Sequence, residues 1–247
     1  MIKLLSYIII YFITFCLILF QPAYAQKFLG GAVAGINISQ VDGDEVVGYK
    51  KAGFNGGALL KLHLDKDESW STSMELLFSQ RGAFRKALTT DMCDTCRDKG
   101  IDCDPKVKYN LRTWYVDIPL MFHYEHKKTS WAIGVGASYG RRVFLDEVKN
   151  GVKTEEYIPP FLKNDWNVIA DVQFRIYRGL KANVRFQYSI VPFRKNVEYG
   201  VGNTTPWTRN FYHNYITFRL IYIINEKPSD SPKNKSRKET TVYYSTL

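Results

Sequence analysis

Ionisable side chains recur inside segments of this chain that are otherwise apolar. Two of them, Glu75 and Asp117, are carboxylates of the kind that act as general acid and base in hydrolases. Such chemistry also needs a nucleophile beside its base, and no motif of the chain supplies one, so we predict no catalytic residue and no enzyme activity. The nine charged residues in this setting are Lys61, Glu75, Arg81, Asp117, Asp171, Arg175, Lys181, Arg185 and Arg219.

These nine residues carry both signs of charge, with three carboxylates and six bases. A charge enclosed by protein is strongly destabilising unless it is paired. We therefore expect a network of salt bridges that fills the interior of the protein. A narrow path for ions or protons is the alternative interpretation.

The elements that position these residues follow from an alternation of apolar and polar side chains, which is typical of strands with two different faces. Short turns and long loops alternate between the strands, as in an up-and-down transmembrane barrel with short periplasmic turns and long external loops. We predict an all-β fold, an eight-stranded antiparallel β-barrel. Its strands are expected at residues 28–38, 56–64, 70–82, 110–124, 130–140, 166–177, 180–191 and 211–224, and its long loops at 39–55, 83–109, 141–165 and 192–210.

The two ends of the chain differ from the strand region. Residues 1–25 combine Lys3, an apolar run and the small-x-small sequence Ala23-Tyr24-Ala25, which predicts a cleaved signal peptide. Residues 26–225 are the predicted outer-membrane barrel. Residues 226–247 are polar and basic with two prolines, which predicts a disordered periplasmic tail.

One face of the predicted strands is wholly apolar or aromatic and suits contact with lipid. In the segment 113–124 this face runs from Trp114 to Tyr124, whereas Asp117 and His123 lie on the other face. Four tryptophans fall at strand ends, two at each expected membrane surface, and predict aromatic girdles. These are Trp70, Trp114, Trp131 and Trp166.

A soluble barrel with its apolar face inside is the alternative to this membrane interpretation. Small residues at Ala132, Gly134, Gly136 and Ser138 favour the membrane barrel, because they suit a narrow lumen better than a solvated exterior. The formal net charge of +10 would allow binding to nucleic acid, but no nucleic-acid-binding motif is present. We therefore expect outer-membrane lipid as a partner and no nucleic acid.

Three cysteines, Cys93, Cys96 and Cys103, lie in the second long loop. The cell surface is oxidising, so we expect a disulfide between two of them, with one thiol left over. A metal site or an intermolecular thiol are the alternatives, although a four-ligand zinc site lacks a partner. We predict no metal and no cofactor.

Three motifs carry a family resemblance: GGAVAGINISQ at residues 30–40, ELLFSQRG at 75–82 and YVDIPL at 115–120. Together they resemble the PorT-like outer-membrane β-barrels of the Bacteroidota, in order and strand layout over nearly the whole mature chain. The founding member of that family is associated with type IX secretion. The loop with the three cysteines has no counterpart in the family pattern.

Three functions fit these observations. The first is a non-enzymatic scaffold or accessory subunit that joins envelope or secretion-machinery proteins, with type IX secretion or envelope assembly as its setting. The second is a small channel or uptake barrel. The third is a surface adhesin that binds through its external loops.

Overall fold

The computed structural model describes residues 28–44, 48–65, 67–86, 108–126, 130–154, 159–199, 207–224 and 226. The predicted signal peptide, the tail after Glu226 and the three loop cysteines lie outside the described residues. No helix in the described part of the chain is long and apolar enough to cross a membrane. The strands are β1 (Phe28–Asp42), β2 (Lys51–His63), β3 (Trp70–Arg85), β4 (Tyr109–Glu125), β5 (Trp131–Lys149), β6 (Val152–Lys153), β7 (Asn164–Tyr177), β8 (Leu180–Ser189), β9 (Arg194–Tyr199) and β10 (Trp207–Ile223).

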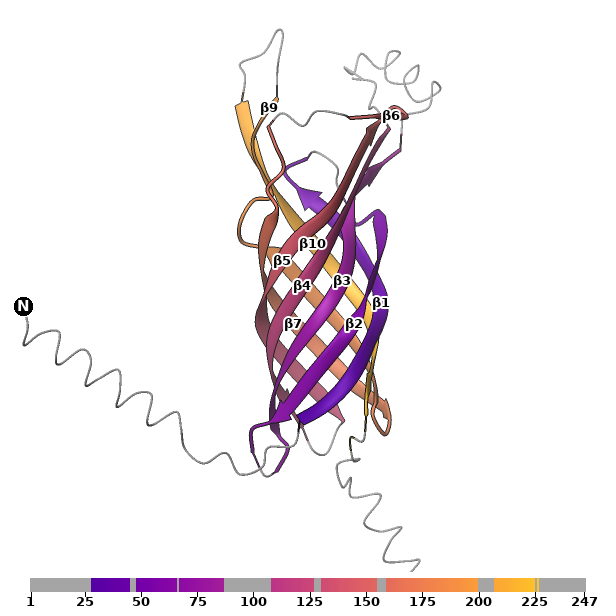
Figure 1. The fold of residues 1–247 in the computed structure, drawn as a ribbon, viewed down its shortest axis with the longest axis vertical. Helices are drawn as coiled ribbons and strands as arrows, with labels where there is room; N and C mark the ends of the chain where they lie inside the picture. Colours follow the sequence, from indigo (N-terminus) through magenta and orange to yellow (C-terminus); the bar gives the residue numbers. More distant parts are fainter. Residues whose placement is uncertain are drawn as a thin grey trace, which may run out of the picture.

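Eight of these strands form a closed antiparallel barrel, as the sequence predicts (Figure 1). Neighbours follow the order β1, β2, β3, β4, β5, β7, β8 and β10, and β10 pairs back onto β1 from Gly31↔Ile223 to Asp42↔Tyr212. The closure satisfies the backbone groups of every strand, which a lipid environment demands. The two remaining strands are appended to the cylinder, with β6 paired to β5 and β9 paired to β10.

Side chains alternate between the outside and the lumen, which is the space that the eight strands enclose. In β4, Leu120 and Phe122 are about half exposed, whereas Tyr115 and Met121 are fully buried. The same strand places Asp117 and His123 inside. The assignment of faces made from the sequence is therefore confirmed, and the apolar outer surface is the one that lipid covers.

The external parts of the barrel hold more strand than the sequence predicted. β5 continues to Lys149 and β6 pairs with it, although residues 141–165 were expected to form a loop. β9 and the start of β10 likewise occupy part of the expected loop 192–210. In Figure 1 the β5–β6 end and the β9–β10 hairpin rise above the rest of the cylinder.

The sequence did carry a signal for the β5–β6 hairpin. Asn150-Gly151 joins the two strands, and both residues have positive φ angles of 51° and 81°. This is the backbone of a type I′ turn, for which an Asn-Gly pair is strongly preferred. The charged residues of the segment obscured it, since outside the membrane a strand need not present an apolar face.

We expect the purified protein to be heat-modifiable. A closed barrel leaves no strand edge for detergent to attack, so the folded cylinder should persist in sodium dodecyl sulfate until it is heated. Boiled and unboiled samples should therefore migrate differently on a gel. Identical migration at all temperatures would contradict the closed barrel, and recovery in the soluble periplasmic fraction would contradict its membrane location.

Candidate functional site

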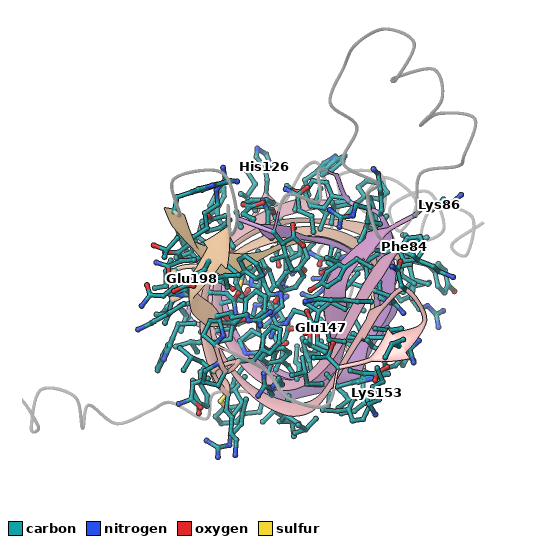
Figure 2. The ribbon with its side chains drawn as sticks, turned by 90° about the horizontal axis from the view of Figure 1, so that it is seen from above. Phe84, Lys86, His126, Glu147, Lys153 and Glu198 are labelled. Carbon is teal, nitrogen blue, oxygen red and sulfur yellow. The ribbon has the colours of Figure 1, made fainter. Side chains whose placement is uncertain are left out.

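The lumen is the part of the protein where charged side chains gather. Figure 2, seen from above, shows side chains rich in nitrogen and oxygen crowding the inside of the ring of strands. Glu147 points into this ring, whereas Lys153 and Glu198 lie at its periphery (Figure 2). Glu147 pairs with the buried Arg194 at 3.5 Å. The other luminal charges described below fall into three clusters, which we call the central, external and periplasmic clusters.

The central cluster joins Glu75 and Asp171 to two arginines. Glu75 accepts hydrogen bonds from Arg185 at 2.9 and 3.0 Å and from Arg219 at 2.7 and 3.0 Å. Arg185 also donates two bonds to Asp171 Oδ2, at 2.9 and 3.1 Å. All four side chains are almost inaccessible to solvent. Paired guanidinium–carboxylate contacts of this geometry are the strong form of the salt bridge.

His123 and Gln173 extend the central cluster toward β5. His123 Nε2 lies 3.1 Å from Asp171 Oδ1 and 2.8 Å from Gln173 Nε2. Gly134 makes room for them, since a Cβ atom at that position would lie 2.4 Å from His123 Cδ2 and 2.5 Å from Asp171 Oδ1. The run of small residues on β5 thus accommodates the polar network.

We expect Gly134→Ala to destabilise the barrel by about 1–3 kcal/mol, the usual cost of overpacking. The added methyl group would force His123 or Asp171 to move and would break their contact. The measurement is the midpoint of urea unfolding in detergent micelles. Gly30→Ala is the matched control, because nothing lies within 4 Å of a Cβ there. Equal midpoints for the two variants would contradict the tight fit around Gly134.

The external cluster is built around Arg81. This guanidinium lies 2.8 Å from Asp117 and 3.3 Å from Asp165, and it donates a hydrogen bond to the Tyr215 hydroxyl. It also lies 3.9 Å from the centre of the Tyr115 ring, a cation–π geometry. Asp117 and Glu75 therefore belong to different clusters with different arginines, and these two acids do not form a pair.

The periplasmic cluster contains three bases and two carboxylates. Lys61, Lys181 and Arg175 all contact both Glu125 and Glu226. Burial raises the pKa of Glu226, but the charges of the three bases outweigh it and hold that pKa below its ordinary value. Glu226 was assigned to the tail from the sequence. In the structure it is buried at 6% exposure and belongs to the mouth of the barrel.

Aromatic side chains close the external end of the lumen. Phe161, Phe193 and Phe211 are buried and pack in a cluster with Leu111. We call these three phenylalanines the aromatic cap. Phe193 stacks on His213 at 3.8 Å between ring centres, so the aromatic cap lies directly against the polar side chains of the lumen. Phe161, Phe193 and Phe211 therefore cover the external mouth of the lumen.

The four tryptophans predicted as girdles each pack against another aromatic ring. At the end with short turns, Trp70 lies 4.9 Å from Tyr124 and Trp131 lies 5.0 Å from Phe174, between ring centres. At the opposite end the partners are Phe78 for Trp114 and Tyr139 for Trp166, at 4.7 and 5.0 Å. These rings are the ones we expect at the two membrane surfaces.

The nine charged residues leave out other luminal residues: Glu125, Asp165, Tyr115, His213, Tyr215 and Glu226. Tyr115 and Tyr215 share the inward parity of Asp117 and Arg219 on their strands, as the sequence predicts. Asp165 and Glu125 share the inward parity of Asp171 and His123, but each lies at a strand end, where a long loop and a short turn were expected. Among the described residues no group of three His, Cys, Asp or Glu could hold a metal ion.

The fold and its outward apolar surface define an outer-membrane β-barrel of the eight-stranded class. The chain belongs to the family described as outer membrane protein beta-barrel domain, whose sequence pattern matches residues 24–194. The protein is accordingly located in the outer membrane. No curated protein sequence matches the chain.

Solved structures of small barrels resemble this chain at low sequence identity. Ail, the attachment invasion locus protein of Yersinia pestis, is 12% identical with a TM-score of 0.43, covering 80% of this chain and 99% of Ail. Neisserial surface protein A is 9% identical with a TM-score of 0.41, covering 79% and 96%. A major outer membrane protein from Thermus thermophilus is 12% identical with a TM-score of 0.41, covering 81% and 100%.

Proposed function

We propose that this protein is a non-enzymatic scaffold or accessory subunit of the outer membrane, which acts through its surfaces outside the bilayer and not through its lumen. The observation that carries the proposal is the filling of the lumen. Three clusters of paired charges follow one another along the bore, and the aromatic cap covers the external end. An eight-stranded barrel is narrow enough for side chains to fill it.

A conductance measurement distinguishes this proposed function from that of a channel or uptake barrel. Purified full-length protein in planar lipid bilayers should give no steady single-channel current, because the path is occupied by buried, paired side chains. Reproducible current steps that change in the Asp117→Asn variant would overturn the proposal and establish conduction through the lumen.

The end of β5 with β6, together with the β9–β10 hairpin, rises above the rest of the cylinder (Figure 1), and we call this part the external extension. It supplies a surface for a protein partner. Val152 on β6 is 71% exposed, and Trp207 at the start of β10 is 39% exposed. Exposed apolar side chains beyond the lipid-covered zone are a common feature of binding surfaces. The same surface would serve a surface adhesin, the second candidate function, whose ligand would belong to another cell or to matrix.

The test is a pull-down in mild detergent from outer membranes, with the tail intact. We expect co-purification of envelope or secretion-machinery proteins, and the resemblance to PorT-like barrels makes type IX secretion components the first set to examine. Val152→Glu should release the partner. Leu64→Glu, at the opposite end of the barrel, is the matched control because Leu64 is also exposed.

If the pull-down recovers the barrel alone and the purified protein binds to cells or matrix, the scaffold function would be overturned in favour of the adhesin function. A partner retained equally by Val152→Glu and Leu64→Glu would show that the external extension is not its docking surface.

A further inference from the structure

The periplasmic cluster has the composition of a receptor for a carboxylate. We propose that Lys61, Lys181 and Arg175 form a carboxylate-binding site at the periplasmic mouth of the barrel, that Glu226 occupies it, and that an acidic side chain of a periplasmic polypeptide can take the place of Glu226. The proposal stands apart from the scaffold function, since it concerns a site at the other end of the molecule from the external extension.

The contacts of Glu226 are those of a bound ligand. Its Oε1 atom lies 2.9 Å from Lys61 Nζ, 2.9 Å from Lys181 Nζ and 3.4 Å from Arg175. Its other oxygen, Oε2, is buried and has no hydrogen-bond partner among the described residues. One carboxylate oxygen thus contacts three cationic groups, while the second can accept a hydrogen bond from a further donor.

The site requires an anion. Glu125 contacts the same three bases, with 3.2 Å to each of the two lysines. Among the described residues, Glu125 and Glu226 are the carboxylates that Lys61 and Lys181 contact, and these two lysines are only 5% and 1% exposed, so without Glu226 they would share a single carboxylate. Buried cations in excess over their counter-charges are strongly unfavourable, so a second carboxylate must come from somewhere.

The two carboxylates differ in how the fold holds them. Glu125 belongs to β4, pairs with Ala132 of β5, and donates its backbone N–H to Ser69 at 2.7 Å. Glu226 follows the end of β10, beyond the last ladder contact from Ile224 N–H to the Gly30 carbonyl at 2.8 Å. Glu125 is therefore held within the strand ladder, whereas Glu226 lies beyond the ladder in the described part of the chain and is the carboxylate that we propose a partner can replace.

The ligand class follows from this arrangement. Glu226 reaches the bases through its side chain just after the end of β10, and a polypeptide that presents Glu or Asp in the same way would make the same contacts. A free carboxylate has the same chemistry, so the experiment must distinguish the two sources.

The first measurement uses chemical rescue of full-length protein in micelles. Glu226→Ala should lower the temperature at which the barrel unfolds in the gel assay, and sodium propionate should restore it where sodium chloride at equal ionic strength does not. Wild-type protein and Glu198→Ala, which removes an exposed external carboxylate, should not respond to propionate. Glu226→Gln fills the site with a neutral group and should respond less than Glu226→Ala.

The second measurement uses a fluorescent peptide with the sequence of residues 225–229, NEKPS, and its Gln-containing counterpart. The Glu peptide should bind Glu226→Ala at least tenfold more tightly than wild type, and Lys61→Gln in the same background should abolish the binding. Failure of both propionate and peptide to act on Glu226→Ala would overturn the site. Rescue by propionate without peptide binding would overturn the polypeptide ligand and assign free carboxylates.

Discussion

Glu75→Gln is expected to destabilise the barrel by about 3–5 kcal/mol, the cost of removing one partner from a buried ion pair. Glu75 is the shared partner of Arg185 and Arg219, and it accepts two hydrogen bonds from each. Arg185 would keep Asp171, but the nearest approach of Arg219 to that carboxylate is 3.7 Å. The substitution therefore leaves a buried guanidinium with little compensation. The midpoint of urea unfolding in micelles measures the loss.

Arg219→Met is the informative comparison for Glu75→Gln. It removes a charge from the same cluster, yet Glu75 keeps both bonds from Arg185, and Arg185 keeps Asp171. We therefore expect Arg219→Met to cost clearly less than Glu75→Gln, because both remaining carboxylates keep a contact of 2.9 Å with Arg185, whereas Glu75→Gln leaves Arg219 no carboxylate nearer than 3.7 Å in the described cluster. Met74→Ala, next to Glu75 but half exposed on the lipid side, controls for a change in β3 itself. Equal losses for Glu75→Gln and Arg219→Met would mean that charge pairing does not stabilise the lumen.

The membrane-spanning part of the fold was predictable because a barrel in lipid constrains the sequence at every second residue. β4 shows this most clearly: its outward residues from Trp114 to Tyr124 are apolar or aromatic, and polar residues such as Asp117 and His123 lie inside. Outside the membrane the constraint ends. The stretch of β5 from Arg141 to Lys149 carries charges on both faces, so its alternation does not predict a strand.

The pairing of luminal charges was most predictable between strands that are neighbours in the chain, and a short turn fixes their register. Asp171 and Arg185 face each other directly across β7 and β8, which a tight turn joins. Lys61 is different, since its strand neighbours are Leu29 and Ser73, and its ionic partners come from across the lumen. Contacts across a barrel depend on the stagger of all the strands, which the sequence of one strand does not contain.

Leu120→Arg should impair insertion of the barrel into lipid, at a cost of about 2–4 kcal/mol, because it places a charge near the midplane of the bilayer. Leu120 is 50% exposed on the outward face of β4, midway between Trp114 and Tyr124. Its neighbours are Met74 and Ala137, which offer no counter-charge.

The matched control is Leu64→Arg, the same change at a residue 48% exposed beyond the end of β2, level with the short turns. There the charge reaches the interface and should cost about 0–1 kcal/mol. The measurement is urea-dependent folding into lipid vesicles, compared between the two variants and wild type. Equal costs at the two positions would contradict the placement of the bilayer between the two sets of aromatic pairs. A large cost at Leu120 alone would place the centre of the hydrocarbon at the height of that residue.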